Sequence, residues 1–172
     1  MKPSDLLQSE YFEYYSPYVA LVGDITLLEA LEKGLMDTKL FFKALPKEKQ
    51  VYQYDEGKWT PKEVLLHITD TERVLCYRAM YFARAKNSTI EGFDENTFAS
   101  NSNANKRTID DLLNEFIAVR TATICMFKSF GEAALKRGGM ANNNLLSVRA
   151  LGFIICGHSL HHENVIKERY LH

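Results

Sequence analysis

The distribution of apolar residues restricts the fold of this chain most, because four segments repeat them at helical spacing. Only four prolines and nine glycines interrupt the 172 residues, and they fall mainly where these segments stop. An apolar stripe with a period of 3.6 residues allows a helix to bury one face against its neighbours. No segment shows the alternation typical of a half-buried strand. The sequence therefore predicts an all-α fold, a four-helix bundle with at least two long connections.

Capping residues predict where these helices begin and end. The clearest start is Thr60-Pro61-Lys62-Glu63, which combines a capping box with proline at the first helical position, so that helix is expected to reach about residue 86. The other three helices are predicted over residues 25–45 after an N-cap at Asp24, over residues 108–131, and from an N-cap at Ser147 toward the C-terminus. The polar stretch 87–107 and the glycine- and asparagine-rich stretch near residues 138–144 are expected to be loops. Loops of this length often line a site.

Composition and charge narrow the functional class. The chain has 21 Lys+Arg against 22 Asp+Glu, so no global positive field favours nucleic-acid binding. No run approaches the roughly 18 consecutive apolar residues of a membrane span, and the first 15 residues lack the apolar segment of a signal peptide. With 46% hydrophobic residues the chain can bury one substantial core, so we expect a single cytoplasmic domain over residues 1–172.

The three cysteines, Cys76, Cys125 and Cys156, are an odd number, are widely spaced and lie in apolar helical stretches. A disulfide framework is not expected at this length and cysteine density. A ligating or nucleophilic thiol is the alternative for Cys156, which lies two residues before His158. We interpret all three as buried, reduced packing residues.

Four of the five histidines lie in the second and last predicted helices. His158 and His162 are four residues apart, a spacing that places both imidazoles on one side of a helix, about 6 Å from each other. Both continue an apolar stripe of the last helix, and His67 continues a stripe of the second helix. The three imidazoles are therefore predicted to point into one bundle interior.

Three buried imidazoles without a common partner would be costly, because each neutral ring keeps a donor and an acceptor. A shared divalent cation removes this cost, and nitrogen ligands suit Zn²⁺, Ni²⁺, Fe²⁺ or Cu²⁺ better than Ca²⁺ or Mg²⁺. Three protein ligands also leave positions open for water or substrate, as in catalytic sites. We predict a metal site, with Zn²⁺ or Ni²⁺ favoured, at His67, His158 and His162.

Alternatives remain open for these histidines. An isolated HxxxH pair on a helix face more often consists of hydrogen-bonded or half-exposed residues than of ligands. His161 lies three residues after His158 and is the alternative to His162 as a ligand. His172 is terminal, and we expect it to be frayed.

Two carboxylates near His67 are candidates for contact with its second ring nitrogen or with the metal. Asp70 lies three residues after His67 and Glu63 four residues before it, and the alternative for each is an ordinary surface carboxylate. Glu163 directly follows His162 and should project about 100° away from it, toward solvent or a neighbouring helix. We therefore place Glu163 outside the site.

Two arginines are candidates for binding anionic substrate groups, since a guanidinium holds a carboxylate through two hydrogen bonds. Arg149 lies in the first turn of the last helix, and Arg120 lies in the third helix. Surface salt bridges are the alternative for both. We interpret Trp59 as a core anchor rather than a platform for substrate.

The run WTPKEVLLHITDTER at residues 59–73, together with GHSLHH at residues 157–162, resembles the DinB-like superfamily, including its YfiT-type members. Segments around Gly23, Phe93 and Val119 also fall where that family has similar ones, so the resemblance covers nearly the whole chain. It implies an up-and-down-type bundle with an unusual long connection. It also implies a metal held by the histidine of the second helix and the HxxxH pair of the last, here His67, His158 and His162.

Characterised relatives transfer low-molecular-weight thiols, such as bacillithiol or mycothiol, to electrophiles or catalyse thiol-dependent isomerisation. The resemblance therefore implies a metal-dependent thiol transferase or hydrolase, with a thiol as cosubstrate, and a homodimer. The metal would act as a Lewis acid that lowers the pKa of a bound thiol or water. The competing interpretation is a non-catalytic metal-binding bundle that senses stress or binds a partner, which a fourth protein ligand would favour.

Overall fold

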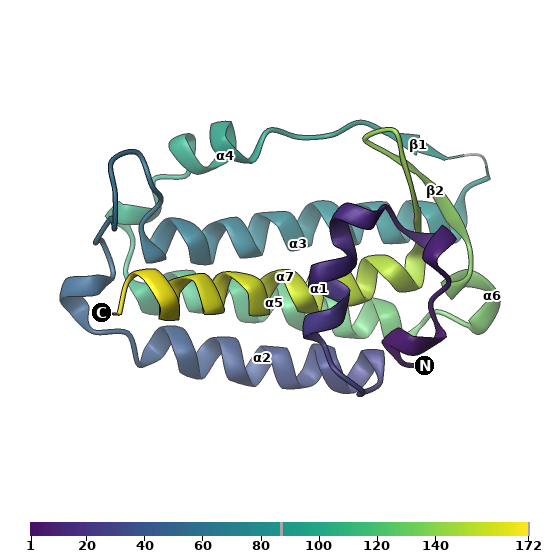
Figure 1. Cartoon of the computed structure of the whole chain (residues 1–172), viewed down its shortest axis with the longest axis horizontal. Helices are drawn as coiled ribbons and strands as arrows, with labels where there is room; N and C mark the ends of the chain where they lie inside the picture. The colour runs from purple at the N-terminus through teal and green to yellow at the C-terminus, as the bar shows by residue number, and fades with distance from the viewer. Residues whose placement is uncertain (87, 172) are drawn as a thin grey trace.

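Four long helices lie side by side in the structure, a computed structural model that describes residues 1–86 and 88–171 (Figure 1). They are α2 (Leu27–Lys43), α3 (Pro61–Arg84), α5 (Ile109–Lys128) and α7 (Val148–Arg169). Extensive contacts join α3 to α5 and α7, and α2 to the same two helices. In cross-section α2 therefore lies diagonally opposite α3. The predicted all-α four-helix bundle is confirmed.

Local capping explains where these helices begin. At the start of α3, the Thr60 hydroxyl accepts a hydrogen bond from the Glu63 N–H at 3.2 Å, and the Glu63 carboxylate accepts one from the Thr60 N–H at 2.8 Å. Thr108 and Ser147 cap α5 and α7 as predicted. The predicted N-cap Asp24 is wrong, because Thr26 forms a capping box with Glu29 and α2 begins two residues later than expected. A capping box satisfies two free backbone donors at once, which favours the later start.

The two stretches expected to be loops contain short regular elements. They include β1 (Thr89–Ile90), α4 (Glu95–Asn101), α6 (Glu132–Leu135), β2 (Gly138–Ala141) and β3 (Asn144–Ser147). β1 pairs parallel to β2, and β2 pairs antiparallel to β3, at the end of the bundle where α3 ends and α7 begins (Figure 1). Asn142 and Asn143 both have positive φ, which suits the tight turn between β2 and β3. Strands of two to four residues are too short to show a period in the sequence.

The N-terminal segment crosses α7. It contains α1 (Ser16–Leu21), preceded by short 3₁₀ turns at Pro3–Asp5, Gln8–Glu10 and Glu13–Tyr15. Two further 3₁₀ turns lie in later connections, at Lys47–Lys49 and Ala104–Lys106. A Cβ atom added to Gly157 would lie 1.9 Å from the Tyr18 carbonyl oxygen, so only glycine allows α1 to approach α7 this closely. The crossing point is therefore adjacent to His158.

A buried ion pair separates two apolar clusters along the bundle. One cluster includes Leu31, Phe82 and Phe153, and the other includes Phe42 and Phe116. The Arg120 and Glu72 side chains lie between them. Arg120 Nε donates to Glu72 Oε1 at 2.8 Å, and Arg120 Nη2 donates to Glu72 Oε2 at 2.8 Å. Arg120 also donates to Ser159 Oγ at 3.1 Å, and Thr123 Oγ1 donates to Glu72 Oε1 at 2.7 Å. This network connects α3, α5 and α7.

The cysteines are all free, but they differ in burial. Cys156 is buried, Cys76 is half-buried with its sulfur 3.1 Å from Thr123 Oγ1, and Cys125 is exposed. The prediction that all three are buried is wrong for Cys125, because Ile124 and Phe127 face the core while Cys125 lies on the outer face of α5. Burial raises the pKa of Cys76 and of Cys156 to about 12, so neither is a thiolate near neutral pH. Among the described helices, none combines the length and apolar character that a membrane crossing requires.

Candidate metal centre

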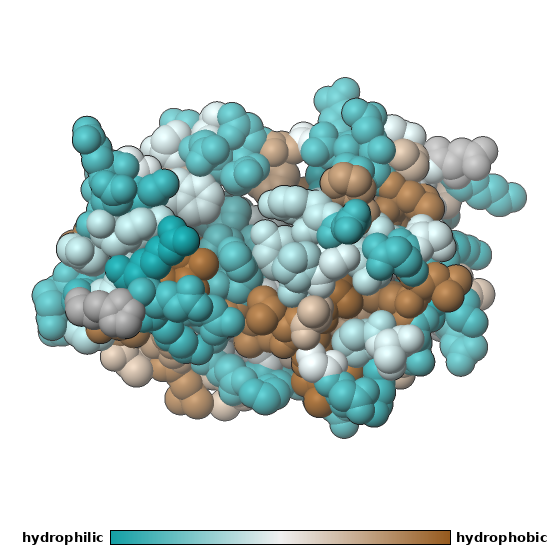
Figure 2. Space-filling model, viewed as in Figure 1, coloured by the Kyte–Doolittle hydropathy of each residue, from teal (hydrophilic) through white to brown (hydrophobic). Residues whose placement is uncertain are grey.

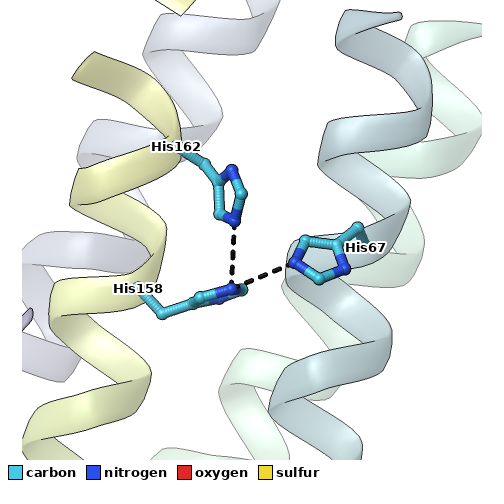
Figure 3. Close-up of side chains that lie close together, drawn as sticks. All are labelled: His67, His158 and His162. Atoms are coloured by element: carbon cyan, nitrogen blue, oxygen red, sulfur yellow. Dashed lines mark hydrogen bonds between the residues drawn. The ribbon is translucent and has the colours of Figure 1, made fainter. Parts of the chain in front are cut away.

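Three imidazoles converge between α3 and α7. The Nε2 atom of His67 lies 3.1 Å from Nε2 of His158, and Nε2 of His162 lies 3.1 Å from that same atom (Figure 3). One ring nitrogen from each histidine lies within 4.8 Å of those of the other two. The structure thus brings together the three histidines that the sequence analysis selected.

Hydrogen bonding alone does not satisfy this arrangement. A neutral imidazole nitrogen carries either one proton or one lone pair in the ring plane. The Nε2 atom of His158 faces two other Nε2 atoms, so at most one of these contacts can be a good hydrogen bond. A cation between the rings would accept the lone pairs of all three nitrogens.

The observed separations suit nitrogen ligands of a transition metal. With metal–nitrogen bonds of about 2.0–2.1 Å, adjacent nitrogens lie about 3.3 Å apart in a tetrahedral sphere and about 2.9 Å apart in an octahedral one. The two 3.1 Å separations from His158 fall between these two values, and the nitrogens of His67 and His162 lie within 4.8 Å of each other. Neutral nitrogen donors also match Zn²⁺ or Ni²⁺ better than Ca²⁺ or Mg²⁺.

The surroundings keep these imidazoles neutral. Burial lowers the pKa of His67 to about 4. Burial, followed by the proximity of His67 and His161, lowers the pKa of His162 to about 3. Burial and then the neighbouring imidazoles hold the pKa of His158 well below its usual range. All three rings are therefore uncharged near neutral pH, with one nitrogen lone pair available, which is the form that binds metals.

Two aromatic rings fix the orientation of the histidines. The Trp59 ring packs on His67 with 4.6 Å between ring centroids, and Tyr18 contacts the ring of His158 edge-on at 5.8 Å. Trp59 also packs against a core cluster, so it acts both as the predicted anchor and as a wall of the site. Sequence reasoning missed Tyr18. The one signal for it was Gly157, a small residue where another segment could approach the ligand-bearing helix.

His161 lies beside the cluster without joining it. Its ring contacts Tyr18 at 5.2 Å and His162 at 5.1 Å between centroids. The group of converging ring nitrogens contains His162 and not His161. His172 lies outside the described residues.

A pocket of about 430 Å³ opens beside the three imidazoles. Its other walls come from the N-terminal segment through Tyr15 and Tyr18, from the connection after α3 through Phe93 and Glu95, and from the β2–β3 turn. Figure 2 shows the surface hollowed between α4 and the N-terminal segment. As expected, part of the long connection between the second and third bundle helices lines this pocket.

The carboxylates considered near His67 have other partners. Asp70 accepts a hydrogen bond from Arg73 at 2.8 Å, and Glu63 completes the capping box of α3. Glu163 is buried and accepts a hydrogen bond from Thr38 Oγ1 at 2.6 Å, so it points to the neighbouring helix α2, one of the two directions expected. In the described part of the chain, these three carboxylates make no hydrogen bond to the clustered imidazoles.

The two candidate arginines are engaged in ion pairs outside the pocket. Arg120 is fully buried against Glu72. Arg149 donates to Glu10 from Nε at 2.7 Å and lines a separate hollow with Met1 and Asp5. Neither side chain lines the pocket beside the histidines. Both form salt bridges, but the expected surface location is wrong for Arg120, because its ion pair with Glu72 is buried in the bundle. The arginine that does line this pocket is Arg78, which sequence reasoning did not select.

Fold and site together define a class of protein, a four-helix bundle with a candidate metal centre between two of its helices. The structure is similar to that of YfiT from Bacillus subtilis, with a TM-score of 0.75, 16% sequence identity and coverage of 85% of this chain and 88% of that one. YfiT is described as a probable metal-dependent hydrolase with an unusual four-helix bundle topology. No curated protein matches the chain by sequence.

The family follows from the sequence match. The model of the DinB superfamily matches residues 30–166, which include all three clustered histidines. Because the match covers most of the chain, the protein belongs to the DinB superfamily. The resemblance noted from the two histidine-containing segments is thereby confirmed.

Proposed function

We propose that this protein is a metal-dependent enzyme whose divalent cation, Zn²⁺ or Ni²⁺, is held by His67, His158 and His162. The observation that carries the proposal is the convergence of three ring nitrogens beside an open pocket: the Nε2 atoms of His67 and His162 each lie 3.1 Å from Nε2 of the buried His158, and all three residues offer nitrogens within 4.8 Å of one another. The description of YfiT as metal-dependent agrees with this proposal. Three protein ligands leave coordination positions free for a small molecule.

The reaction we favour is transfer of a low-molecular-weight thiol to an electrophile. When bound, the cation supplies Lewis acidity that lowers the pKa of a thiol or a water molecule. The thiol gives up its proton to solvent, its sulfur forms a bond to the electrophilic carbon, and the displaced leaving group departs with its electron pair. The three imidazoles would hold the cation at the end of the pocket, next to the reacting group, while Trp59 and Tyr18 limit access of water. Hydrolysis uses the same site with water as the nucleophile.

A non-catalytic metal-binding bundle is the competing function. A fourth protein ligand would favour it by closing the coordination sphere. The cluster of candidate ligands contains only the three histidines within the described residues. An adjacent pocket of this size is also more useful to an enzyme than to a structural site.

The first test is metal retention. Because all three rings contribute to one cluster, replacing His67, His158 or His162 by Ala should each abolish stoichiometric retention of Zn²⁺ or Ni²⁺ in elemental analysis. His161→Ala is the matched control, since this neighbouring ring lies outside the cluster. Full metal content in the three single variants would refute the ligand assignment, and equal loss from His161→Ala would reassign the HxxxH pair.

The second test asks whether the site accepts a thiol. In the Co²⁺-substituted protein, binding of a small thiol such as cysteine, glutathione or bacillithiol should add an intense charge-transfer band in the near ultraviolet. His158→Ala should not show this band. Activity assays with the same thiols and a generic electrophile should require metal and thiol together. An unchanged spectrum with every thiol would rule out the transferase proposal and leave hydrolysis or the non-catalytic function.

A further inference from the structure

Arg78 is a buried arginine in the wall of the pocket beside the three histidines. Its side chain is only 4% exposed. His67, Thr71, Leu75 and Arg78 follow one another at helical spacing on α3, and all four line this pocket. The guanidinium therefore lies on the same wall as a candidate metal ligand, three helical turns further along.

The hydrogen bonds of Arg78 are incomplete. One terminal nitrogen donates to the Glu91 carbonyl at 3.1 Å, and Nε is buried without a hydrogen-bond partner. Within the described residues, no carboxylate forms an ion pair with it. Arg120 and Arg149, in contrast, each donate through two nitrogens to a carboxylate.

An unpaired buried guanidinium is costly, because the charge has lost its hydration without gaining a counter-ion. Burial lowers the pKa of Arg78, and the opposing effect comes from Tyr15 rather than from a carboxylate. The Thr71 hydroxyl, one to two turns from both His67 and Arg78, is likewise buried without a hydrogen-bond partner. Two polar groups without hydrogen-bond partners on one wall of a pocket indicate that a polar ligand supplies the missing hydrogen bonds.

A carboxylate suits this wall better than a phosphate. The planar guanidinium offers parallel N–H donors that match the two oxygens of a carboxylate. Arg78 supplies a single positive charge, and Glu95, which also lines the pocket, would repel a dianion more strongly than a monoanion. A monoanionic group is therefore the better match.

We propose that Arg78 binds a carboxylate of the substrate or thiol whose reacting end lies at the three histidines. This inference rests on the proposed function for the position of the reacting end, but the carboxylate site itself requires no metal. His67 and Arg78 are eleven positions apart, which corresponds to about 16 Å along the helix axis and sets an upper limit on the length of the ligand. The substrate class is thus an elongated carboxylic acid that carries the thiol or the electrophile at its other end.

The test uses ω-mercaptocarboxylic acids of increasing chain length and the matching ω-mercaptoalcohols. With Co²⁺-substituted protein, titration of the near-ultraviolet band should show that acids of one optimal length bind roughly ten- to hundred-fold more tightly than the alcohols. Arg78→Met should remove this preference, and Arg78→Lys should retain part of it. Arg84→Met is the matched control, because it removes an exposed arginine from the same helix. Circular dichroism would verify that each variant is folded.

Metal-free measurements separate this inference from the proposed function. Calorimetry with simple alkanoic acids and the corresponding alcohols measures the carboxylate preference even if the protein retains no metal. Equal binding of acids and alcohols to wild type, or an unchanged preference in Arg78→Met, would overturn the assignment of Arg78. Tighter binding of ω-mercaptoalkyl phosphates than of the acids would refute the carboxylate class. In each case the metal-retention result would stand independently.

Discussion

Single buried polar residues in this protein fall into two groups. Glu72 and Arg120 satisfy each other within the bundle, and Glu163 accepts a hydrogen bond from Thr38. The histidine cluster and Arg78 are not satisfied in this way. Buried polar groups normally have partners, so several unsatisfied ones along one pocket mark where a ligand is needed. The histidines, Thr71 and Arg78 line the same pocket, whereas Ser88, whose buried hydroxyl also lacks a partner among the described residues, does not.

At the residue scale, we predict that the stability of the metal-free protein depends on pH. Burial lowers the pKa of His67 from 6.5 to about 4, so between these values the unfolded chain binds more protons than the folded one. The contribution of His67 to the free energy of unfolding should therefore be fully present above pH 6.5. It should fall by on the order of 3 kcal/mol as the pH decreases toward 4. Urea unfolding of chelator-treated protein across this window measures it. A variant with Gln at all three histidines should show a weaker dependence, and an identical dependence would contradict the prediction.

Among the elements, α7 contributes most to the site, because it carries two of the three candidate ligands. Its start is fixed by the Ser147 cap, and its middle is held by α1, which crosses at Gly157. This crossing also places Tyr18 on His158 and His161. The packing of α1 on α7 therefore orients the side chains of the cluster.

Gly157→Ala should disturb this element pair. The added Cβ would meet the backbone of Tyr18 at 1.9 Å, so α1 must shift, at a cost of roughly 1–3 kcal/mol. Urea unfolding would measure the loss of stability. Relative to wild type, amide hydrogen exchange should become faster in α1 (Ser16–Leu21) and change less in α5. Gly131→Ala serves as the control, since nothing lies within 4 Å of its added Cβ. Wild-type stability and α1 protection in Gly157→Ala would show that the crossing is not tight.

Over the whole molecule, the candidate metal centre links two helices from distant parts of the sequence. His67 lies on α3 and the HxxxH pair on α7, and these helices pack directly against each other. A ligand that binds only the folded state stabilises that state, and the stabilisation grows with the logarithm of the ratio of ligand concentration to dissociation constant. Metal occupancy should therefore affect global stability and not only the pocket.

We predict that the thermal unfolding midpoint rises on addition of Zn²⁺ or Ni²⁺ and returns on chelation. At a thousand-fold excess over the dissociation constant, the stabilisation would be about 4 kcal/mol. Circular dichroism, which should be strongly helical with or without metal, follows the transition. His161→Ala should keep the response and His158→Ala should lose it. A wild-type midpoint that does not respond to metal would argue against a site between α3 and α7.

The sequence by itself determined the features that depend on neighbours along one helix. Capping residues placed the starts of α3, α5 and α7, since a cap uses donors only a few residues away. The four-residue spacing of His158 and His162 set both rings on one side of α7 for the same reason. The apolar stripes then indicated that His67 would face them.

Tertiary structure decided what depends on how helices rotate and which distant segments meet. It exposed Cys125, paired β1 with β2, and placed Tyr18 over the histidines. It also gave Arg120 a buried carboxylate partner and left Arg78 in the pocket with no carboxylate partner among the described residues, although both are arginines in apolar helical stretches. Spacing within a helix fixes the relative directions of its own side chains. Which of them meets a partner, a pocket or solvent is set by contacts between residues far apart in sequence, which no local pattern specifies.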